Sequence, residues 1–388
     1  MITSATPRIA QDTLPQPTLY LAFELGKKTW KLGFTIGVAQ QPRERTLPAG
    51  DVARVQQEIA RAKQRFGLPE DARVVSCYEA GRDGFWLHRY LVAHGVQNHV
   101  IDSASIEVNR RHRRAKTDRL DVHKLLTMLL RHHAGERKVW SVVQVPSMEE
   151  EDRRQLHREL QTAKRDRMRV TNRMQGLLSN VGVRLTLQGD VSAHLEQLRQ
   201  WDGTPLPPAL RARLERDWQQ VCFLTEQIKT LEAHRRELLR TSADPVLEQV
   251  RQLVSLRGIG ITSAWLFVME FFAWRGFQNG KEVGALAGLT PTPHQSGQVR
   301  HELGIAKAGN GQMRTMAVEI AWGWLQFQPT SALSQWYQAR FGHGNAGYRK
   351  LGIVALARKL LIALWRFIET GVLPEGAVLK AAVPHATP

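Results

Sequence analysis

The sequence predicts three structural parts: an α/β domain at the N-terminus, a long helical hairpin of coiled-coil type, and a mainly helical C-terminal domain. Strand-like stretches with apolar residues occur at 19–26, 29–36 and 73–79. From residue 156 the apolar positions instead follow steps of four and three, the spacing of a long helix. After residue 250 the chain turns apolar again, around a glycine-containing turn. We therefore expect a leader (1–18), an α/β domain (19–145), the helical hairpin (146–245), a C-terminal domain (246–370) and a tail (371–388).

The α/β domain begins with two strands that form a hairpin across a short turn, and Glu24 is the one charge in the first. A helix (52–66) leads to the strand at 73–79, which ends in Glu79. A second helix (85–94) and a short strand (99–101) follow. Carboxyl ends of parallel strands commonly carry functional groups. Taken singly, however, Glu24 is equally well an edge-strand charge and Glu79 a turn residue.

Asp118 and Asp121 are three residues apart in a stretch whose leucines recur at helical spacing. Such a spacing places two carboxylates on one helix face, where they can hold a divalent cation. A strongly basic segment precedes them and predicts a phosphate-binding surface. It contains Arg110, Arg111, Arg113, Arg114 and Lys116. The alternative is a solvated helix whose aspartates pair with neighbouring arginines.

Composition indicates a nucleic-acid partner. Lys and Arg number 54 against 36 Asp and Glu, a formal net charge of +18, and such an excess is typical of proteins that bind polyanions. The two cysteines exclude a disulfide framework and a cysteine-rich zinc site. No apolar run is long enough to span a bilayer, and residues 1–17 lack the apolar core of a signal peptide. We expect a cytoplasmic protein without a membrane partner.

The order of the four acids resembles a known domain. Glu24 in a hairpin strand, then Tyr78-Glu79-Ala80-Gly81, then Lys116-Thr117-Asp118-Arg119-Leu120-Asp121 is similar to the RuvC-like, DEDD-type domain of one family of bacterial insertion-sequence transposases. That resemblance implies an RNase H fold. It also implies that Glu24, Glu79, Asp118 and Asp121 bind Mg²⁺, or Mn²⁺ in its place, at the scissile DNA. The family usually has Asp at the first position, so Glu24 is a departure whose longer side chain would shift the metal.

The middle of the chain predicts two long helices joined by a proline-rich turn. The first starts near residue 156, with Arg167 standing where the next apolar residue is due, and the second spans about 210–239. The other positions of the first helix are strongly basic: Arg153, Arg154, Arg158, Lys164, Arg165, Arg169 and Arg173. They are enough to follow a phosphate backbone, although a solvated face is an equal alternative. The pair of helices forms either an antiparallel hairpin or an arm that pairs subunits, and we expect self-association.

The C-terminal part predicts a helix-hairpin-helix at 253–264, whose Gly-Ile-Gly turn lets backbone amides approach phosphates. Three motifs follow: Leu-Ala-Gly-Leu-Thr-Pro (286–291), Gln-Ser-Gly-Gln-Val-Arg (295–300) and Ile-Ala-Lys-Ala-Gly-Asn-Gly-Gln-Met-Arg (305–314). This series resembles the C-terminal domain of the same transposase family, and the resemblance covers about residues 19–370. It implies that Ser296 is a nucleophile. A lone Ser-Gly pair would be read as a turn.

The chemistry requires an activated serine, because a hydroxyl is a weak nucleophile at neutral pH. His294 and His301 are candidate bases, and each is equally well a surface residue. Basic groups near the serine would neutralise the developing charge, and a helix opening at 309–311 would turn its amides toward an anion. The nucleic-acid-binding candidates here are Arg300, Lys307, Asn310 and Arg314. A core helix (351–368) and a loose tail are expected to close the chain.

The resemblance implies a transposase or recombinase, associated with the nucleoid, that cuts and rejoins donor and target DNA. The reaction would use Mg²⁺ and a transient phosphoserine. Family members work as dimers or tetramers and are guided by a structured noncoding RNA. Two alternatives stay open: a junction-type nuclease in which the acids activate water, and a non-catalytic nucleic-acid-binding protein. A covalent protein–DNA adduct separates the first reading from both, and Mg²⁺-dependent cleavage separates the two alternatives.

Overall fold

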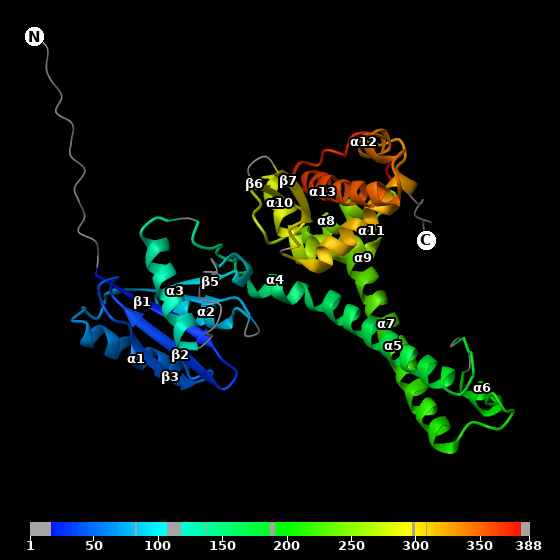
Figure 1. Cartoon of the computed structure of the whole chain (residues 1–388), viewed down its shortest axis with the longest axis horizontal. Helices are drawn as coiled ribbons and strands as arrows, with labels where there is room; N and C mark the ends of the chain where they lie inside the picture. The colour runs from blue at the N-terminus through cyan, green and yellow to red at the C-terminus, as the bar shows by residue number, and fades with distance from the viewer. Residues whose placement is uncertain are drawn as a thin grey trace, which may run out of the picture. The chain divides into compact units, whose positions relative to one another are not determined.

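The computed structural model describes residues 17–81, 84–106, 118–136, 138–186, 191–296, 299–307 and 309–381. Within these ranges the side chains of 104, 118, 119, 192 and 293–303 are not described. The chain divides into two compact units, Met1–Val145 and Pro146–Pro388. Figure 1 shows a sheet in the first unit and mostly helices in the second.

The first unit is built on a five-stranded mixed sheet with the order β3-β2-β1-β4-β5. Its strands are β1 (Thr18–Leu25), β2 (Thr29–Thr35), β3 (Arg43–Pro48), β4 (Arg73–Glu79) and β5 (Val96–Ile101). β1, β2 and β3 are antiparallel neighbours, whereas β4 and β5 run parallel to β1. The predicted hairpin and the two later strands are confirmed. This arrangement is compatible with an RNase H-like domain.

Sequence reasoning missed β3 because the strand is polar. It reads Arg-Glu-Arg-Thr-Leu-Pro, and only Leu47 among its residues is buried. A strand at the edge of a sheet needs little apolar surface, and charges there discourage pairing with other chains. Its Arg43 and Arg45 bind the buried carboxylate of Glu58 on the neighbouring helix, at 2.7 and 3.0 Å.

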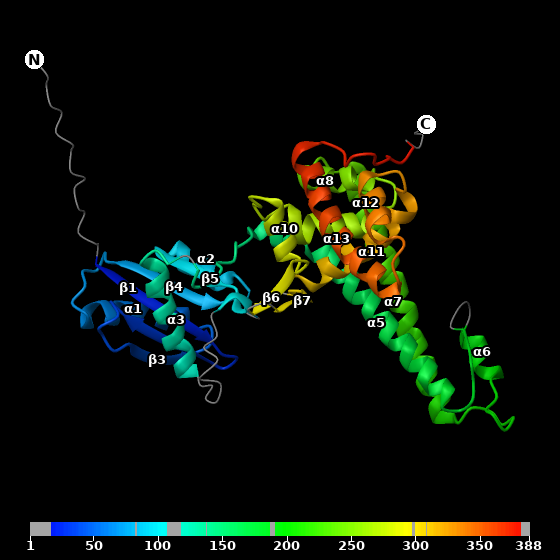
Figure 2. The same cartoon turned by 45° about the horizontal axis from the view of Figure 1, so that its top comes forward.

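Each face of the sheet has its own hydrophobic core. The helices α1 (Val52–Arg65) and α2 (Trp86–Ala93) cover the face that carries Leu21 and Phe23. The helix α3 (Asp118–His133) covers the opposite face, which carries Ala22. Figure 2 shows α3 lying across the strands of the sheet. The helices predicted at 52–66 and 85–94 are thus confirmed.

The second unit carries a long antiparallel helical arm. The arm is formed by α5 (Gln155–Ser179) and α7 (Pro208–Thr241), and its far end holds the short α6 (Val191–Gln197) (Figure 1). Ion pairs run in opposite order along the two long helices, Lys164 with Glu232 and Arg173 with Asp217. The predicted pair of long helices is therefore confirmed as a hairpin within one chain. A short helix, α4 (Met148–Arg153), precedes it.

The rest of the second unit is a mainly helical bundle around one large core. Its elements are α8 (Pro245–Val254), α9 (Ile261–Phe267), the π-helical turn η3 (Val268–Phe272), α10 (Gly280–Leu286), β6 (Pro291–Ser296), β7 (Val299–Ile305), α11 (Gly311–Phe327), α12 (Ala332–Phe341) and α13 (Ala346–Thr370). The predicted closing helix is confirmed and starts five residues earlier than expected. None of the helices in the described ranges combines the length and apolar character that crossing a membrane requires.

A short turn joins α8 and α9 where the helix-hairpin-helix was predicted, with Gly258 in the left-handed region at a φ of 87°. The segment after α13 crosses this turn. The backbone amide of Lys380 donates to the Ser255 carbonyl at 2.7 Å, and its ammonium donates to the carbonyls of Val254 and Ile259. The expectation of a loose tail is therefore wrong as far as Lys380, because these bonds hold the segment on the bundle.

Candidate active site

Glu24 and Glu79 lie at the carboxyl ends of two neighbouring parallel strands. The register of β1 and β4 pairs Phe23 with Tyr78, so each glutamate is the next residue of its strand. Both glutamates are half-buried, and both line one cavity of about 220 Å³. The fold thus brings together two carboxylates that are far apart in the sequence.

Both glutamates belong to the face of the sheet that α3 covers. Successive side chains of a strand point to opposite faces, and Ala22 on β1 and Cys77 on β4 contribute to the core under α3. Glu24 and Glu79 follow these residues by two positions. Acidic residues on α3 are therefore on the same side of the sheet as the two glutamates.

The direction of α3 points its first turn toward the end of β1 that carries Glu24. The hydroxyl of Tyr20, near the start of β1, lies 2.8 Å from Nδ1 of His133, the last residue of α3. Val122, near the start of the helix, packs over Gly33, which lies opposite the middle of β1. Helix and strand therefore run in opposite directions.

Of the two aspartates on α3, the structure describes the side chain of Asp121 alone. Asp121 lies in the first turn of the helix and is half-exposed. Asp118 is the first residue of the helix, and its side chain is outside the described part. Among the side chains that are described, no three acids, histidines or cysteines surround a common point. The structure shows that Glu24 and Glu79 line one cavity. The joint site of all four acids stays a prediction.

The residues around the cavity fit a hard divalent cation. Mg²⁺ prefers carboxylate and other oxygen ligands to thiols, and two carboxylates line this cavity. Cys77 lies on the same face and is completely buried. Burial, followed by the charge of Glu79, raises the pKa of its thiol. The thiol stays protonated and does not compete as a ligand.

The basic segment that was expected to bind phosphates lies outside the described residues, and its role stays a prediction. The segment comprises Arg110, Arg111, Arg113, Arg114 and Lys116. It directly precedes α3 in the chain. It is therefore attached at the end of the helix that carries Asp118 and Asp121.

Ser296 is the last residue of β6. The two-stranded hairpin pairs it with Val299 and pairs His294 with His301, so the backbone places Ser296 at the hairpin tip. The side chains of 293–303, that of Arg300 included, are outside the described part. A tip position suits a turn and a nucleophile equally well, and the choice of base stays open.

The loop between β7 and α11 is held by a hydrogen bond from α11 and by close packing at Gly309. Among the described residues other than glycine, only Lys307 has a left-handed backbone, with a φ of 55°. Its carbonyl accepts a hydrogen bond of 3.1 Å from Arg314. Gly309 packs so closely that an added Cβ would lie 2.1 Å from the Leu286 carbonyl oxygen. Arg314 thus fixes the loop, while the Lys307 side chain is exposed.

Asn310 caps α11. Its Oδ1 accepts hydrogen bonds from the amides of Gln312 and Met313 at 3.0 and 3.2 Å. The helix starts where it was predicted. The expectation that its first amides face an anion is wrong for these two, because the cap already satisfies them.

Most basic side chains of α5 form ion pairs within the chain. Arg158 binds both carboxylate oxygens of Glu270, at 2.7 and 2.8 Å. Further pairs join Lys164 to Glu232, Arg169 to Asp166 and Arg173 to Asp217. Before the helix, Arg153 at the end of α4 binds Asp244. Arg154 is buried over the Trp274 ring. These contacts favour the alternative in which the charges stabilise the arm.

Sequence reasoning missed the residues that position α3. A signal existed for Gly33, because a glycine inside a strand often marks a close approach of another element. No local signal existed for the contact of Tyr20 with His133, since the two are distant in the sequence. On α5, the sequence pattern marked Arg167 as an interruption of the apolar spacing and gave it no functional role.

Comparison with known proteins gives consistent matches. Residues 250–336 match the transposase IS116/IS110/IS902 family. The chain is 40% identical over 378 residues to a Sinorhizobium fredii protein that carries the name transposase y4rJ, covering 93% of this chain and 94% of that protein. It is 28% identical over 213 residues to the transposase for insertion sequence element IS1328 of Yersinia enterocolitica, covering 54% of this chain and 60% of that protein.

Proposed function

The chain belongs to the transposase IS116/IS110/IS902 family, whose members serve insertion-sequence mobility, and we propose that it cuts and rejoins DNA through an acidic Mg²⁺ site and the nucleophile Ser296. The observation that carries the proposal is that Glu24 and Glu79 line one cavity and belong to the sheet face covered by α3, the helix whose first turn holds Asp118 and Asp121. Two carboxylates that line one cavity can serve as oxygen ligands of Mg²⁺, which proteins usually bind through one or two carboxylates.

The chain's own residues would act as follows. Glu24, Glu79, Asp118 and Asp121 hold the cation, which when bound polarises the phosphate and offsets its charge. The Oγ of Ser296 bonds to the phosphorus, its proton leaves to a base, and the bond from phosphorus to the departing DNA oxygen breaks. That oxygen takes up a proton and becomes a hydroxyl. Attack of a DNA hydroxyl on the phosphoserine reverses the exchange and rejoins the strand.

A test of the acidic site compares matched acid-to-amide variants. Glu79→Gln keeps the shape of the side chain and removes its charge, so Mg²⁺-dependent strand cleavage should be lost while DNA binding survives. Glu70→Gln changes an exposed acid just before the same strand and should leave cleavage unchanged. Equal cleavage by both variants would remove the metal site from the proposal.

A guide RNA is the second part of the proposal. The support is the net charge of +18, which favours a polyanionic partner with strong salt dependence. Protein purified at low salt from cells that carry the element's flanking DNA should bring down one discrete RNA. Recovery of heterogeneous host RNA alone would favour an enzyme that binds only DNA.

Assembly of several subunits is the third part. Ser296 and the acidic residues lie in different units of the chain, so one site can receive its acids and its serine from different subunits. Mixing Ser296→Ala with Asp121→Asn should then restore some recombination. Mixtures as inactive as the separate variants would assign both halves of a site to one chain.

A further inference from the structure

Arg167 of α5 is a charged residue whose side chain has no polar partner among the residues that the structure describes. Apolar residues of α5 follow steps of four and three through Leu160, Ala163, Val170 and Met174. Arg167 occupies the position that this spacing assigns to the core. Charged residues at core positions of paired helices reduce stability and are kept where they specify an interaction.

Two other charged residues at core positions, both on α7, are engaged. Asp217 binds Arg173 at 2.6 and 3.1 Å. Arg235 donates through Nη2 to Thr262 at 3.2 Å and lies over the Trp265 ring, while its Nε and Nη1 have no hydrogen-bond partner among the described residues.

In contrast, the side chain of Arg167 has no hydrogen bond or ion pair to any residue that the structure describes. The nearby acids are already bound elsewhere: Asp166 to Arg169, Glu226 to Lys229 and Glu232 to Lys164. The Arg167 residue as a whole is half-buried. It is therefore a partly desolvated cation that an incoming anion would stabilise.

The arm has a cavity at this position. Its apolar core is split into a cluster around Leu160, Ala163 and Ile228 and another that includes Val170 and Val221. At this level of the arm both helices line a cavity of about 860 Å³ that is open to solvent at the exposed Met168 and Cys222, and its volume is within the range of roughly 300–1,000 Å³ that ligand pockets occupy.

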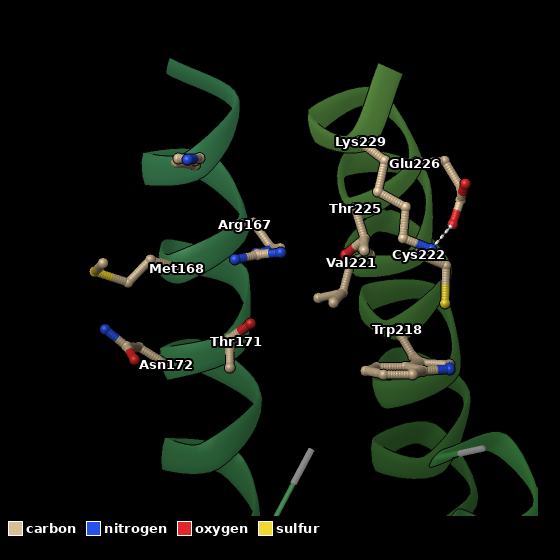
Figure 3. Close-up of a pocket in the computed structure, with 11 residues that line it drawn as sticks. Arg167, Met168, Thr171, Asn172, Trp218, Val221, Cys222, Thr225, Glu226 and Lys229 are labelled. Carbon is tan, nitrogen blue, oxygen red and sulfur yellow. Dashed lines mark hydrogen bonds and ion pairs between the residues drawn. The ribbon is translucent and has the colours of Figure 1, made fainter. Parts of the chain in front are cut away.

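The side chains in the cavity come from both helices. Figure 3 shows Arg167 and Thr171 extending from α5 toward α7, and Trp218, Val221 and Thr225 extending from α7 toward α5. Trp218 is half-buried, and its ring lies lower on α7 in this view than Arg167 lies on α5. The cavity thus combines a cation, an aromatic plane and hydroxyl groups.

We propose that this cavity binds one unstacked nucleotide of a nucleic-acid strand, with its base against Trp218 and its phosphate at Arg167. Aromatic stacking accepts any base, and a guanidinium pairs with a phosphate through two hydrogen bonds. A second copy of the arm fits less well, since paired helices favour close apolar contacts and the cavity lining includes Lys164, Arg167 and Lys229. The inference rests on nucleic-acid binding by the proposed function and does not depend on cleavage.

The test uses the full chain and fluorescent single-stranded oligonucleotides, one RNA and one DNA of equal sequence. Arg167→Leu places an apolar residue at the core position, so thermal stability should stay or rise. The slope of log affinity against log salt concentration should become shallower by about 0.7, the value for one phosphate contact on a single strand. Arg169→Leu removes the same charge from an exposed position of the same helix and should leave the slope unchanged.

A second pair of variants tests the aromatic plane. Trp218→Leu should weaken binding about tenfold, whereas Trp218→Phe should keep most of the affinity. An oligonucleotide carrying bromouracil should crosslink under light to the peptide that contains Trp218. If the variants weaken the binding of the RNA oligonucleotide more than that of the DNA oligonucleotide, the nucleotide belongs to RNA; the opposite result assigns it to DNA.

The outcomes separate the inference from the proposed function. Failure of the wild-type chain to bind either oligonucleotide would contradict the proposed function itself. If the wild-type chain binds and the salt dependence of binding falls equally in Arg167→Leu and Arg169→Leu, the attraction is diffuse and the proposed site in the cavity is overturned. A change of oligomeric state in Arg167→Leu with unaltered oligonucleotide binding would assign the cavity to a second copy of the chain.

Discussion

Replacing Gly33 by alanine should displace α3 and so test whether its acids act with Glu24 and Glu79. An added Cβ would lie 2.4 Å from Cγ1 of Val122 and 2.8 Å from Cδ1 of Leu126, whereas carbon atoms in contact prefer about 3.5–4.0 Å. Val122 is fully buried, and a β-branched side chain in a helix has one strongly preferred rotamer. The helix must therefore retreat by about 1 Å.

The size of the effect follows from two opposing contributions. Overpacking a core costs about 1–3 kcal/mol, and removing a glycine restricts the unfolded chain and returns about 0.4–1 kcal/mol. The free energy of unfolding should thus fall by about 1–2 kcal/mol. A catalytic group displaced by about 1 Å can lose about a hundredfold in rate. Strand cleavage should therefore fall by about that factor while the protein is still folded.

The assay combines urea unfolding with Mg²⁺-dependent cleavage of labelled DNA. In Gly37→Ala the added Cβ meets nothing within 4 Å, so neither measurement should change. Adding Val122→Ala to Gly33→Ala removes the closest clash and should recover part of the activity. A destabilised Gly33→Ala protein that cuts at the wild-type rate would refute a role for the α3 acids. A variant unaltered in both measurements would refute the packing of α3 on β2.

Three further predictions concern other positions. Glu24→Asp should keep cleavage and Glu24→Gln should lose it in the same DNA assay, because a metal ligand needs charge more than length; an active Gln variant would exclude this ligand. Lys380→Met removes the donor to the carbonyls of Val254 and Ile259 and should lower the free energy of unfolding in urea by about 1 kcal/mol, because water replaces part of the bonding of this exposed side chain, whereas Lys350→Met should not. Burial lowers the pKa of His157 from 6.5 to about 4, so the unfolded chain binds a proton between these values that the native chain does not, and stability falls as the pH falls through this window. Urea unfolding should show a loss of about 2 kcal/mol between pH 7 and pH 5 that His157→Gln lacks; equal losses in both proteins would contradict it.

The sequence predicted those elements whose pattern is local. Alternating apolar residues predicted β1, β2 and β4, and the steps of four and three predicted α5 and α7. The sequence pattern did not predict β3, because an edge strand buries few of its side chains and the polar residues of this strand do not alternate with apolar ones. The hydrogen bond from Lys380 to the turn between α8 and α9 was not predicted, because it joins distant parts of the chain.

The candidate site was predictable to a similar extent. The position of Glu24 and Glu79 at strand ends was visible in the sequence, but their convergence in one cavity depends on the parallel pairing of β1 with β4. Ion pairing of Arg158 and Arg173 was not predictable, because the acids that bind them lie on other helices. A run of arginines therefore does not by itself distinguish a phosphate-binding row from a paired helix face.

The most direct test of the account is the covalent state of the DNA after cutting. Labelled duplex carrying one end of the element is incubated with the protein, the RNA recovered with it at low salt and Mg²⁺, and the products are separated under denaturing conditions. We predict a protein–DNA adduct whose modified peptide carries the phosphoryl group on Ser296, present in Thr292→Ala, a control on the same strand, and absent in Ser296→Ala. Cleavage without an adduct, or an adduct that persists in Ser296→Ala, would contradict the account.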